Sequence, residues 1–218
     1  MTGSAGRRPR RKRPGQYHHG DLRRALIDQA LRTVDKRGVE GLTLRAVGDA
    51  LGVSRTALYR HFSDKQALVA AVAREGFRTL RSALVEAWEG GGRGPAGFDR
   101  MGEAYLRFAI GHPAHYRVMF GRFVESGARD PELIDEANGA FQALVDALVQ
   151  QQREGQVRGD DPVMIARFVW SVTHGIAMLV IDGQLHACDD SGAALNRYAA
   201  ERVRAAIAVT ARPSMIGD

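Results

Sequence analysis

The chain has 218 residues, of which 44% are hydrophobic and 26% are charged, so it is long enough to bury a sizeable core as one domain or two. Its single cysteine, Cys188, excludes an internal disulfide and a zinc site built from several cysteines. Residues 1–65 hold 15 Lys and Arg against 6 Asp and Glu, a net charge of +9, whereas residues 66–218 carry a net charge of −3. This asymmetry predicts a polyanion-binding head on a separate body.

Residues 1–16 predict a flexible basic arm, because they lack hydrophobic periodicity and contain prolines and glycines. Six of the seven residues from 7 to 13 are arginine or lysine. Such a run is either a solvated tail or, beside a DNA-binding domain, an arm that follows phosphates or enters the minor groove. No apolar run follows the basic residues, so we expect no secretory signal.

Helical periodicity of apolar residues predicts four helices between the arm and residue 89. Their expected ranges are residues 21–37, 44–51, 55–62 and 64–88. Thr43 and Ser54 are expected to cap the second and third helices, which Gly52 separates. Ser63 and Gln66 have the spacing of a capping box, which predicts that Ser63 caps the fourth helix.

A Gly/Pro-rich segment at residues 90–97 is the strongest internal break, and helical patterns resume after it. The expected segments are residues 98–110, 116–120, 131–155, 162–185 and 193–211. No segment alternates apolar and polar residues as a strand does, so the predicted fold class is all-α. We expect residues 17–65 to form a three-helix N-terminal domain and residues 66–212 to form a helical body.

The segment from residue 43 to residue 68 has the proportions of a helix-turn-helix, with two short helices on either side of Gly52. Apolar residues in both helices are expected to lock them at a fixed angle. The outer face of the second helix is then free to enter the major groove of DNA, whose width admits one helix. Lys65 lies at the start of the next helix, where an ammonium group and backbone amides can meet a phosphate.

Several short motifs occur along residues 17–68: DLRRALIDQAL at residues 21–31, Gly38 followed by Gly41-Leu42-Thr43, Ala46-Val47-Gly48, Leu51-Gly52-Val53-Ser54, and Leu58-Tyr59-Arg60-His61-Phe62 with Lys65. With these motifs, residues 17–68 closely resemble the TetR family of bacterial transcription regulators. The resemblance implies that the third helix contacts bases in the major groove and that a dimer binds a two-fold operator. Gly48 stands where alanine is commoner in the family, which costs the helix up to about 1 kcal/mol.

The resemblance also implies roles for individual residues of the head. It places Tyr59 and Lys65 against backbone phosphates. The full set of candidate DNA-binding residues is Thr43, Arg45, Ser54, Arg55, Thr56, Ala57, Tyr59, Arg60, His61 and Lys65.

Two stretches of the body, residues 104–120 and 169–185, are similar to a ligand-binding domain named for a Trp…His-Gly signature, which here falls on Trp170, His174 and Gly175. The resemblance implies a pocket. The candidate pocket residues are Tyr105, Phe108, Met119, Phe123, Phe141, Trp170, His174 and Met178. For His174, two interpretations remain open: a buried, internally hydrogen-bonded histidine, or a polar group that points at a ligand. An apolar lining with one imidazole suits a largely hydrophobic ligand with one hydrogen-bonding or acidic group.

These patterns together predict a ligand-responsive transcriptional repressor that a small hydrophobic molecule releases from double-stranded operator DNA. The alternative is an activator or a ligand-independent architectural DNA-binding protein. We expect a homodimer through residues 162–185 and 193–211, because the first of these segments is apolar on more than one face. We expect the protein in the bacterial cytoplasm, associated with the nucleoid.

Other classes of function find little support in the sequence. We expect no enzyme, because there is no P-loop, no GxGxxG and no Ser/His/Asp arrangement. We expect no metal and no cofactor, since Pro113 interrupts the helical spacing of His112 and His115. The apolar segment 163–181 contains Arg167, which favours a buried helix over a membrane span.

Overall fold

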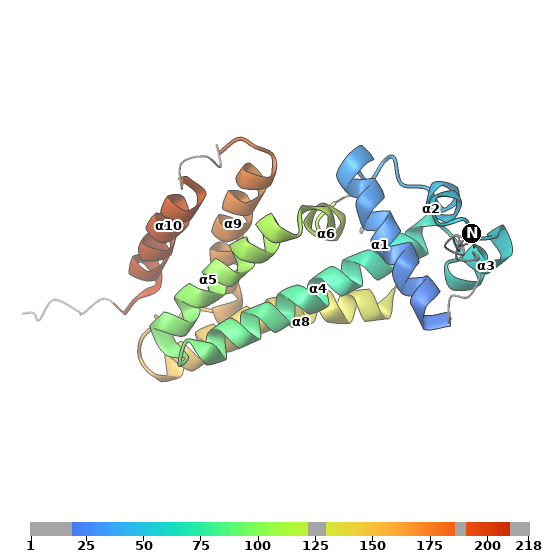
Figure 1. Cartoon of the computed structure of the whole chain (residues 1–218). Coiled ribbons are helices and arrows are strands. Elements are labelled where there is room, and N and C mark those ends of the chain that lie inside the picture. The colour runs from blue at the N-terminus through green and yellow to red at the C-terminus, as the bar shows by residue number, and fades with distance from the viewer. Residues whose placement is uncertain (1–18, 122–129, 186–190, 210–218) are drawn as a thin grey trace, which may run out of the picture.

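The computed structural model describes residues 19–121, 130–185 and 191–209 as a bundle of helices (Figure 1). The helices are α1 (His19–Arg37), α2 (Leu44–Leu51), α3 (Arg55–His61), α4 (Lys65–Gly90), α5 (Gly94–Gly111), α6 (Pro113–Met119), α8 (Pro131–Arg153), α9 (Pro162–Ile181) and α10 (Ser191–Ile207). Over these ranges no strand forms, and β pairing is limited to an isolated bridge between Val157 and Ala208. The predicted all-α fold is confirmed.

Local side-chain chemistry defines the two short helices of the head as expected. The Thr43 hydroxyl accepts a hydrogen bond from the Ala46 amide at 3.1 Å, and the Ser54 hydroxyl accepts one from the Ala57 amide at 3.2 Å. Both bonds satisfy amides that have no partner inside the helix. Gly52 ends α2 with a φ of 65°, a left-handed conformation that favours glycine.

The cap of α4 differs from the sequence prediction. The Asp64 carboxylate, not the Ser63 hydroxyl, accepts a hydrogen bond from the Ala67 amide, at 2.8 Å. Ser63 instead donates its hydroxyl proton to Asp64 at 3.1 Å. The prediction that Ser63 caps this helix was therefore wrong, because a charged acceptor one residue later is correctly placed and makes the stronger bond.

Helix α4 belongs to both parts of the molecule, because α1 packs on it and α2 and α3 lie near its N-terminal end, while α5 and α8 lie along the rest of it (Figure 1). Its buried side chains form one continuous core with those of the head and the body. They include Leu68, Val69 and Val72 toward the head, and Phe77, Leu80, Leu84 and Trp88 toward the body. A single rigid helix thus connects the two parts.

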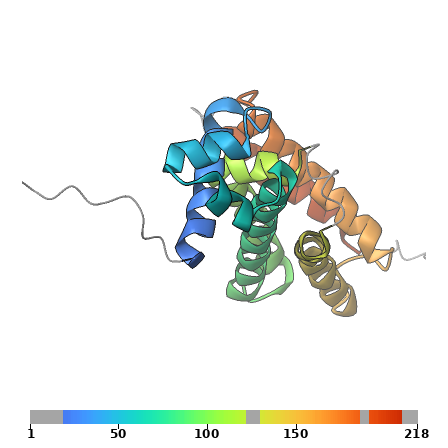
Figure 2. The same cartoon turned by 90° about the vertical axis from the view of Figure 1, so that its right-hand side faces the viewer.

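The body is completed by α8, which runs in the same direction as α4, and by α9 and α10. Arg78 pairs with Glu136 at 2.8 Å and Arg74 pairs with Glu132, so successive turns of the two helices are matched. Figure 2, seen from the end that carries the head, shows α8 beside α4. At the opposite side of the body, α10 packs on α9 and α5.

The corner between α4 and α5 depends on a close approach of the two backbones at glycine residues. A Cβ atom at Gly97 would lie 2.8 Å from the Trp88 carbonyl oxygen and 3.0 Å from the Trp88 ring. Helix α5 begins at Gly94, earlier than expected, because Pro95 suits the first turn of a helix. Arg93, just before it, takes a φ of 62°, so the chain turns between α4 and α5 at this residue.

We predict that Gly97→Ala lowers the free energy of unfolding by about 1–3 kcal/mol, because the added methyl forces the two backbones apart. Gly102→Ala on the same helix is the matched control, since a Cβ there meets no atom within 4 Å. The control is expected to raise stability by about 0.5–1 kcal/mol. Denaturant unfolding measures both values, and equal effects of the two substitutions would contradict the packing described for this corner.

Candidate functional site

The third helix of the head, α3, presents a polar face to solvent. Arg55, Thr56, Tyr59 and Arg60 are exposed, and the Tyr59 side chain is 56% exposed although it is aromatic. Leu58 packs inward with 2% of its surface exposed. The head lies at one extremity of the elongated molecule (Figures 1 and 2), so nothing described in the body covers this face. Its width and exposure fit a major groove.

The remaining candidate residues of the head surround this face. Thr43 and Ser54 are exposed at the helix starts that they cap, and Arg45 is exposed with an ion pair to Asp49 at 3.6 Å. Ala57, His61 and Lys65 are half-buried. The contacts of all ten candidates with DNA stay predictions, because the structure contains no nucleic acid.

Lys65 also has a structural role that no sequence pattern predicted. Its ammonium group donates hydrogen bonds to the carbonyl oxygens of Val39 at 2.9 Å and Glu40 at 3.4 Å. These bonds tie the turn after α1 to the first turn of α4. Lys65 therefore helps to hold the helices of the head at their mutual angle, in addition to the phosphate contact that the resemblance implies.

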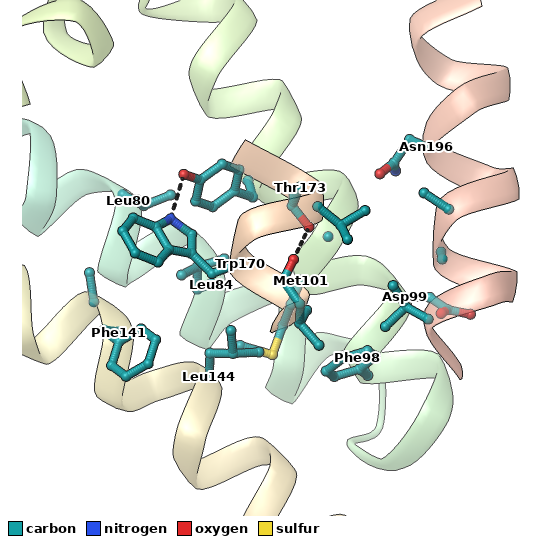
Figure 3. A pocket seen from close by; sticks show the side chains of 18 of the residues that line it. Leu80, Leu84, Phe98, Asp99, Met101, Phe141, Leu144, Trp170, Thr173 and Asn196 are labelled. Carbon is teal, nitrogen blue, oxygen red and sulfur yellow. Dashed lines mark hydrogen bonds between the residues drawn. The ribbon is translucent and has the colours of Figure 1, made fainter. Parts of the chain in front are cut away.

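The body forms a cavity of about 390 Å³ between α4, α5, α8, α9 and α10 (Figure 3). Most of the side chains around it are apolar, and several are aromatic. The aromatic side chains are Phe77, Phe98, Tyr105, Phe120, Phe141 and Trp170. This size and character are typical of a site for a small molecule.

The sequence predicted part of this lining. Tyr105, Phe141 and Trp170 line the cavity, as expected of pocket residues. Phe108, Met119, His174 and Met178 do not line it. Phe123, the basic arm and Cys188 lie outside the described residues.

The candidates that miss the cavity have other partners. Phe108 faces a surface groove between α4 and α5, and Met119 is buried where α6 crosses α4 at Gly76. Met178 is partly buried against the core. Helical spacing identified an apolar face in each case, but it could not tell which neighbouring helix would cover that face.

His174 takes part in a chain of hydrogen bonds beside the cavity. Trp170 donates its indole N–H to the Tyr105 hydroxyl at 3.1 Å, and the hydroxyls of Tyr105 and Tyr116 are 2.9 Å apart. The Tyr116 hydroxyl lies 2.6 Å from His174 Nδ1, and the two rings stack with centroids 5.5 Å apart. The geometry favours the first of the two interpretations of His174, an internally hydrogen-bonded histidine.

Burial keeps the members of this chain neutral. Desolvation raises the pKa of Tyr105 to about 12 and also raises the pKa of Tyr116, so both keep their hydroxyl protons near neutral pH. Desolvation lowers the pKa of His174, which favours the uncharged imidazole. An unprotonated Nδ1 can accept a hydrogen bond from the Tyr116 hydroxyl, whereas a protonated Nδ1 cannot.

A second polar cluster joins the head to the body, and no sequence pattern indicated it. Glu75 on α4 lies 2.9 Å from Arg24 on α1 and 3.6 Å from His115 on α6. Burial lowers the pKa of His115, and this effect outweighs the opposite effect of the nearby Glu75 carboxylate, which raises the pKa. Within the part of the chain that the structure describes, no group of His, Cys, Asp or Glu side chains could hold a metal ion.

Helix α9 leaves an apolar stripe on the surface. Met164, Phe168 and Leu179 are exposed, and a Cβ at Gly175 would meet no atom within 4 Å. By length and composition alone α9 could cross a membrane, but its opposite face packs against α5, α8 and α10 in the body. A stripe of this kind on a helix of a packed body is typical of an interface between subunits.

We predict that acid destabilises the protein partly through His174. Because its folded-state pKa is lowered, the unfolded chain binds more protons, so the stabilisation is complete above about pH 6.5 and is lost as the pH falls through the lowered value. His174→Gln should be less stable at neutral pH but lose less stability on acidification. Chemical unfolding at several pH values measures this, and equal pH dependence in both proteins would contradict it.

Comparisons with known proteins agree with this geometry. Residues 26–72 match the family described as bacterial regulatory proteins, tetR family, and residues 98–205 match the tetracyclin repressor-like C-terminal domain. The second match spans the stretches that carry Tyr105, Trp170 and His174.

Relatives and solved structures match along most of the chain. The HTH-type transcriptional repressor AcnR of Corynebacterium glutamicum is 28% identical over 166 residues, which cover 74% of this chain and 78% of that protein. The HTH-type transcriptional regulator Rv0681 of Mycobacterium tuberculosis is 28% identical over 167 residues, which cover 77% and 73%. A solved structure from Rhodococcus sp. RHA1 is 31% identical with a TM-score of 0.78, covering 88% of this chain and 98% of that one.

Proteins of this kind are soluble cytoplasmic DNA-binding proteins, and the family matches concern regulators rather than enzymes. The helix-turn-helix with its exposed α3 lies within the residues that match the tetR family, and the helical body matches the C-terminal domain of the same group. The chain belongs to the TetR family of bacterial regulatory proteins, and it is a DNA-binding regulator of transcription.

Proposed function

We propose that the protein is a repressor that leaves a two-fold operator when a small hydrophobic molecule fills the body cavity. The observation that supports this most directly is the placement of the cavity against α4. Phe77, Leu80 and Leu84 of this helix line the cavity, and the N-terminal turn of the same helix packs in the head. A ligand in the cavity therefore touches the element that carries the DNA-binding surface.

The mechanism follows from the stiffness of α4 and the geometry of DNA. Two heads on one face of a duplex must lie about one helical turn, about 34–36 Å, apart. A ligand that binds better to a body with α4 displaced shifts the population toward another head spacing, by its difference in affinity for the two states. Operator affinity then falls. The description of AcnR as a repressor supports the direction of the effect.

We further propose that two copies of the chain associate through α9 and α10. The exposed stripe on α9 places Met164, Phe168 and Leu179 on one face, and Tyr198 on α10 is 58% exposed. Two helices from each chain form a four-helix bundle with the two-fold symmetry that a palindromic operator needs.

We predict that Phe168→Glu weakens or abolishes the dimer, because it places a charge in the apolar centre of this interface. Ile134→Glu is the matched control, since Ile134 is similarly exposed but lies on α8. Light scattering at micromolar concentration should give a dimer for the wild type and the control. A monomeric wild-type protein would contradict the proposed assembly.

We predict different consequences for two exposed residues of α3. Tyr59→Ala should weaken binding to every duplex by a similar factor, since a phosphate contact carries no sequence information. Thr56→Ala should instead relax base preference, with about 1–3 kcal/mol lost at the base it contacts. Fluorescence anisotropy with an operator and a shuffled duplex separates the two effects. A loss of base preference in Tyr59→Ala with unchanged general affinity would reverse the assignment.

A reporter gene placed behind the DNA upstream of the protein's own coding sequence tests the direction of regulation. A repressor lowers reporter expression, and the exposed-face variant Thr56→Ala should restore part of it. Expression that rises with the protein would identify an activator, and expression that never responds to the protein would exclude regulation at this site.

A further inference from the structure

We propose that the cavity selects an electrically neutral, mainly apolar molecule whose hydrogen-bonding group points toward α10. The inference rests on the proposed function, in which the cavity is the effector site, and it specifies the chemistry of the effector. It differs from the sequence expectation, which allowed an acidic group because it placed the His174 imidazole in the lining.

The size of the cavity sets the size of the ligand. An apolar cavity of about 150 Å³ in a protein core holds one benzene molecule. A cavity of 390 Å³ therefore holds roughly sixteen non-hydrogen atoms at the same density. Two or three rings, or an equivalent aliphatic chain, match this volume.

The charge of the lining excludes an anion. No Lys, Arg or His side chain lines the cavity among the described residues, and Asp99 is the acidic residue that does. The Asp99 carboxylate is already paired with Arg204, which neutralises that guanidinium. Tyr105 keeps its proton, because desolvation raises its pKa to about 12. A buried carboxylate, sulfonate or phosphate would thus lose its hydration without meeting an opposite charge.

Two polar side chains of the lining lie together at one end, and a third, Asn138 on α8, is exposed to solvent. In Figure 3, Asp99 and Asn196 lie on the α10 side of the cavity, whereas Leu80 and Phe141 lie on the opposite side. Asn196 is buried, with 9% of its surface exposed. The Asp99 Oδ1 atom is buried and accepts no hydrogen bond from the described residues, which marks this end as the polar end of the cavity.

The apolar end of the ligand then lies against α4 and α8. Three other polar groups near the cavity already have partners. The Trp170 indole N–H is donated to Tyr105, His174 Nδ1 lies against the Tyr116 hydroxyl, and the Thr173 hydroxyl donates to the Val169 carbonyl oxygen. The ligand thus spans from the helix that carries the head to a helix of the proposed dimer interface.

Two dyes with the same ring skeleton test the charge selection directly. N-phenyl-1-naphthylamine is neutral and carries one N–H donor, and 1-anilinonaphthalene-8-sulfonate adds an anionic group. The neutral 8-sulfonamide of the same skeleton controls for the size of that group and should bind more tightly than the sulfonate. We expect the neutral dye to bind once per chain with an increase in fluorescence, and the sulfonate to bind at least tenfold more weakly. Two variants locate the site: Gly102→Leu fills the lining, and Gly111→Leu adds the same side chain to an exposed position of α5.

Gly102→Leu should weaken binding of the neutral dye at least tenfold, whereas Gly111→Leu should leave it unchanged. A third variant, Asp99→Asn, leaves Arg204 without its partner, so the sulfonate should bind severalfold more tightly while the neutral dye changes little. A merely structural role of Asp99 would weaken both dyes together, which would count against the proposal.

The outcomes separate this inference from the proposed function. Equal affinity for the two dyes, or binding of the neutral dye that Gly102→Leu does not alter, would overturn the proposed ligand class. Selective binding of the neutral dye in the cavity with no change in duplex affinity would leave the ligand class standing and would instead contradict ligand-controlled repression.

Discussion

The structure depends on a single constraint: one helix, α4, is packed in the head at its N-terminal end and in the body along the rest of its length. Helix α4 buries Leu68 and Val72 with the head and Leu80 and Leu84 with the body, and the core between them is continuous. A helix with both ends packed in this way moves as a rigid rod, because bending it would open packed contacts at one end or the other. The proposed function requires that a displacement at the cavity reaches the head along this helix.

Two polar clusters reinforce this connection at different heights of α4. Glu75 joins α1 to α6 through Arg24 and His115, so the head, the long helix and the short α6 share one half-buried carboxylate. The chain of hydrogen bonds through Tyr116 joins α6 to α5 and α9 beside the cavity. Hydrogen-bonded clusters of this kind stabilise one arrangement of the helices, and their bonds break together. This cooperativity suits the two-state displacement that we propose for α4.

The sequence predicted the head far better than the body, and the reason is the range of the interactions. Thr43, Ser54 and Gly52 act on residues within one turn, so their roles follow from local chemistry. The capping error at Ser63 arose where Asp64 competes for the same amides. Trp170 and His174 share a helical face, yet the hydrogen bond to Tyr116 that occupies His174 comes from a helix distant in sequence. Which side chains line a cavity is decided by such contacts.

The function of the head could be predicted because its candidate residues lie within residues 43–65, whereas the cavity is assembled from five helices. Phe108 illustrates the difference, since it lies one turn from Tyr105 on α5 but faces a groove on the surface. Asp99 and Asn196, which give the cavity its polar end, belong to no motif and were found only in the structure.

The most direct test of the account is the distance between the two heads of a dimer. Ala50 lies on the exposed face of α2, so a spin label at Ala50→Cys in a Cys188→Ser background reports this distance. Pulsed electron paramagnetic resonance measures it. The account predicts that saturation with N-phenyl-1-naphthylamine shifts the distance distribution and lowers duplex affinity in parallel. Identical distributions with the dye bound would contradict the claim that α4 transmits occupancy of the cavity to the head.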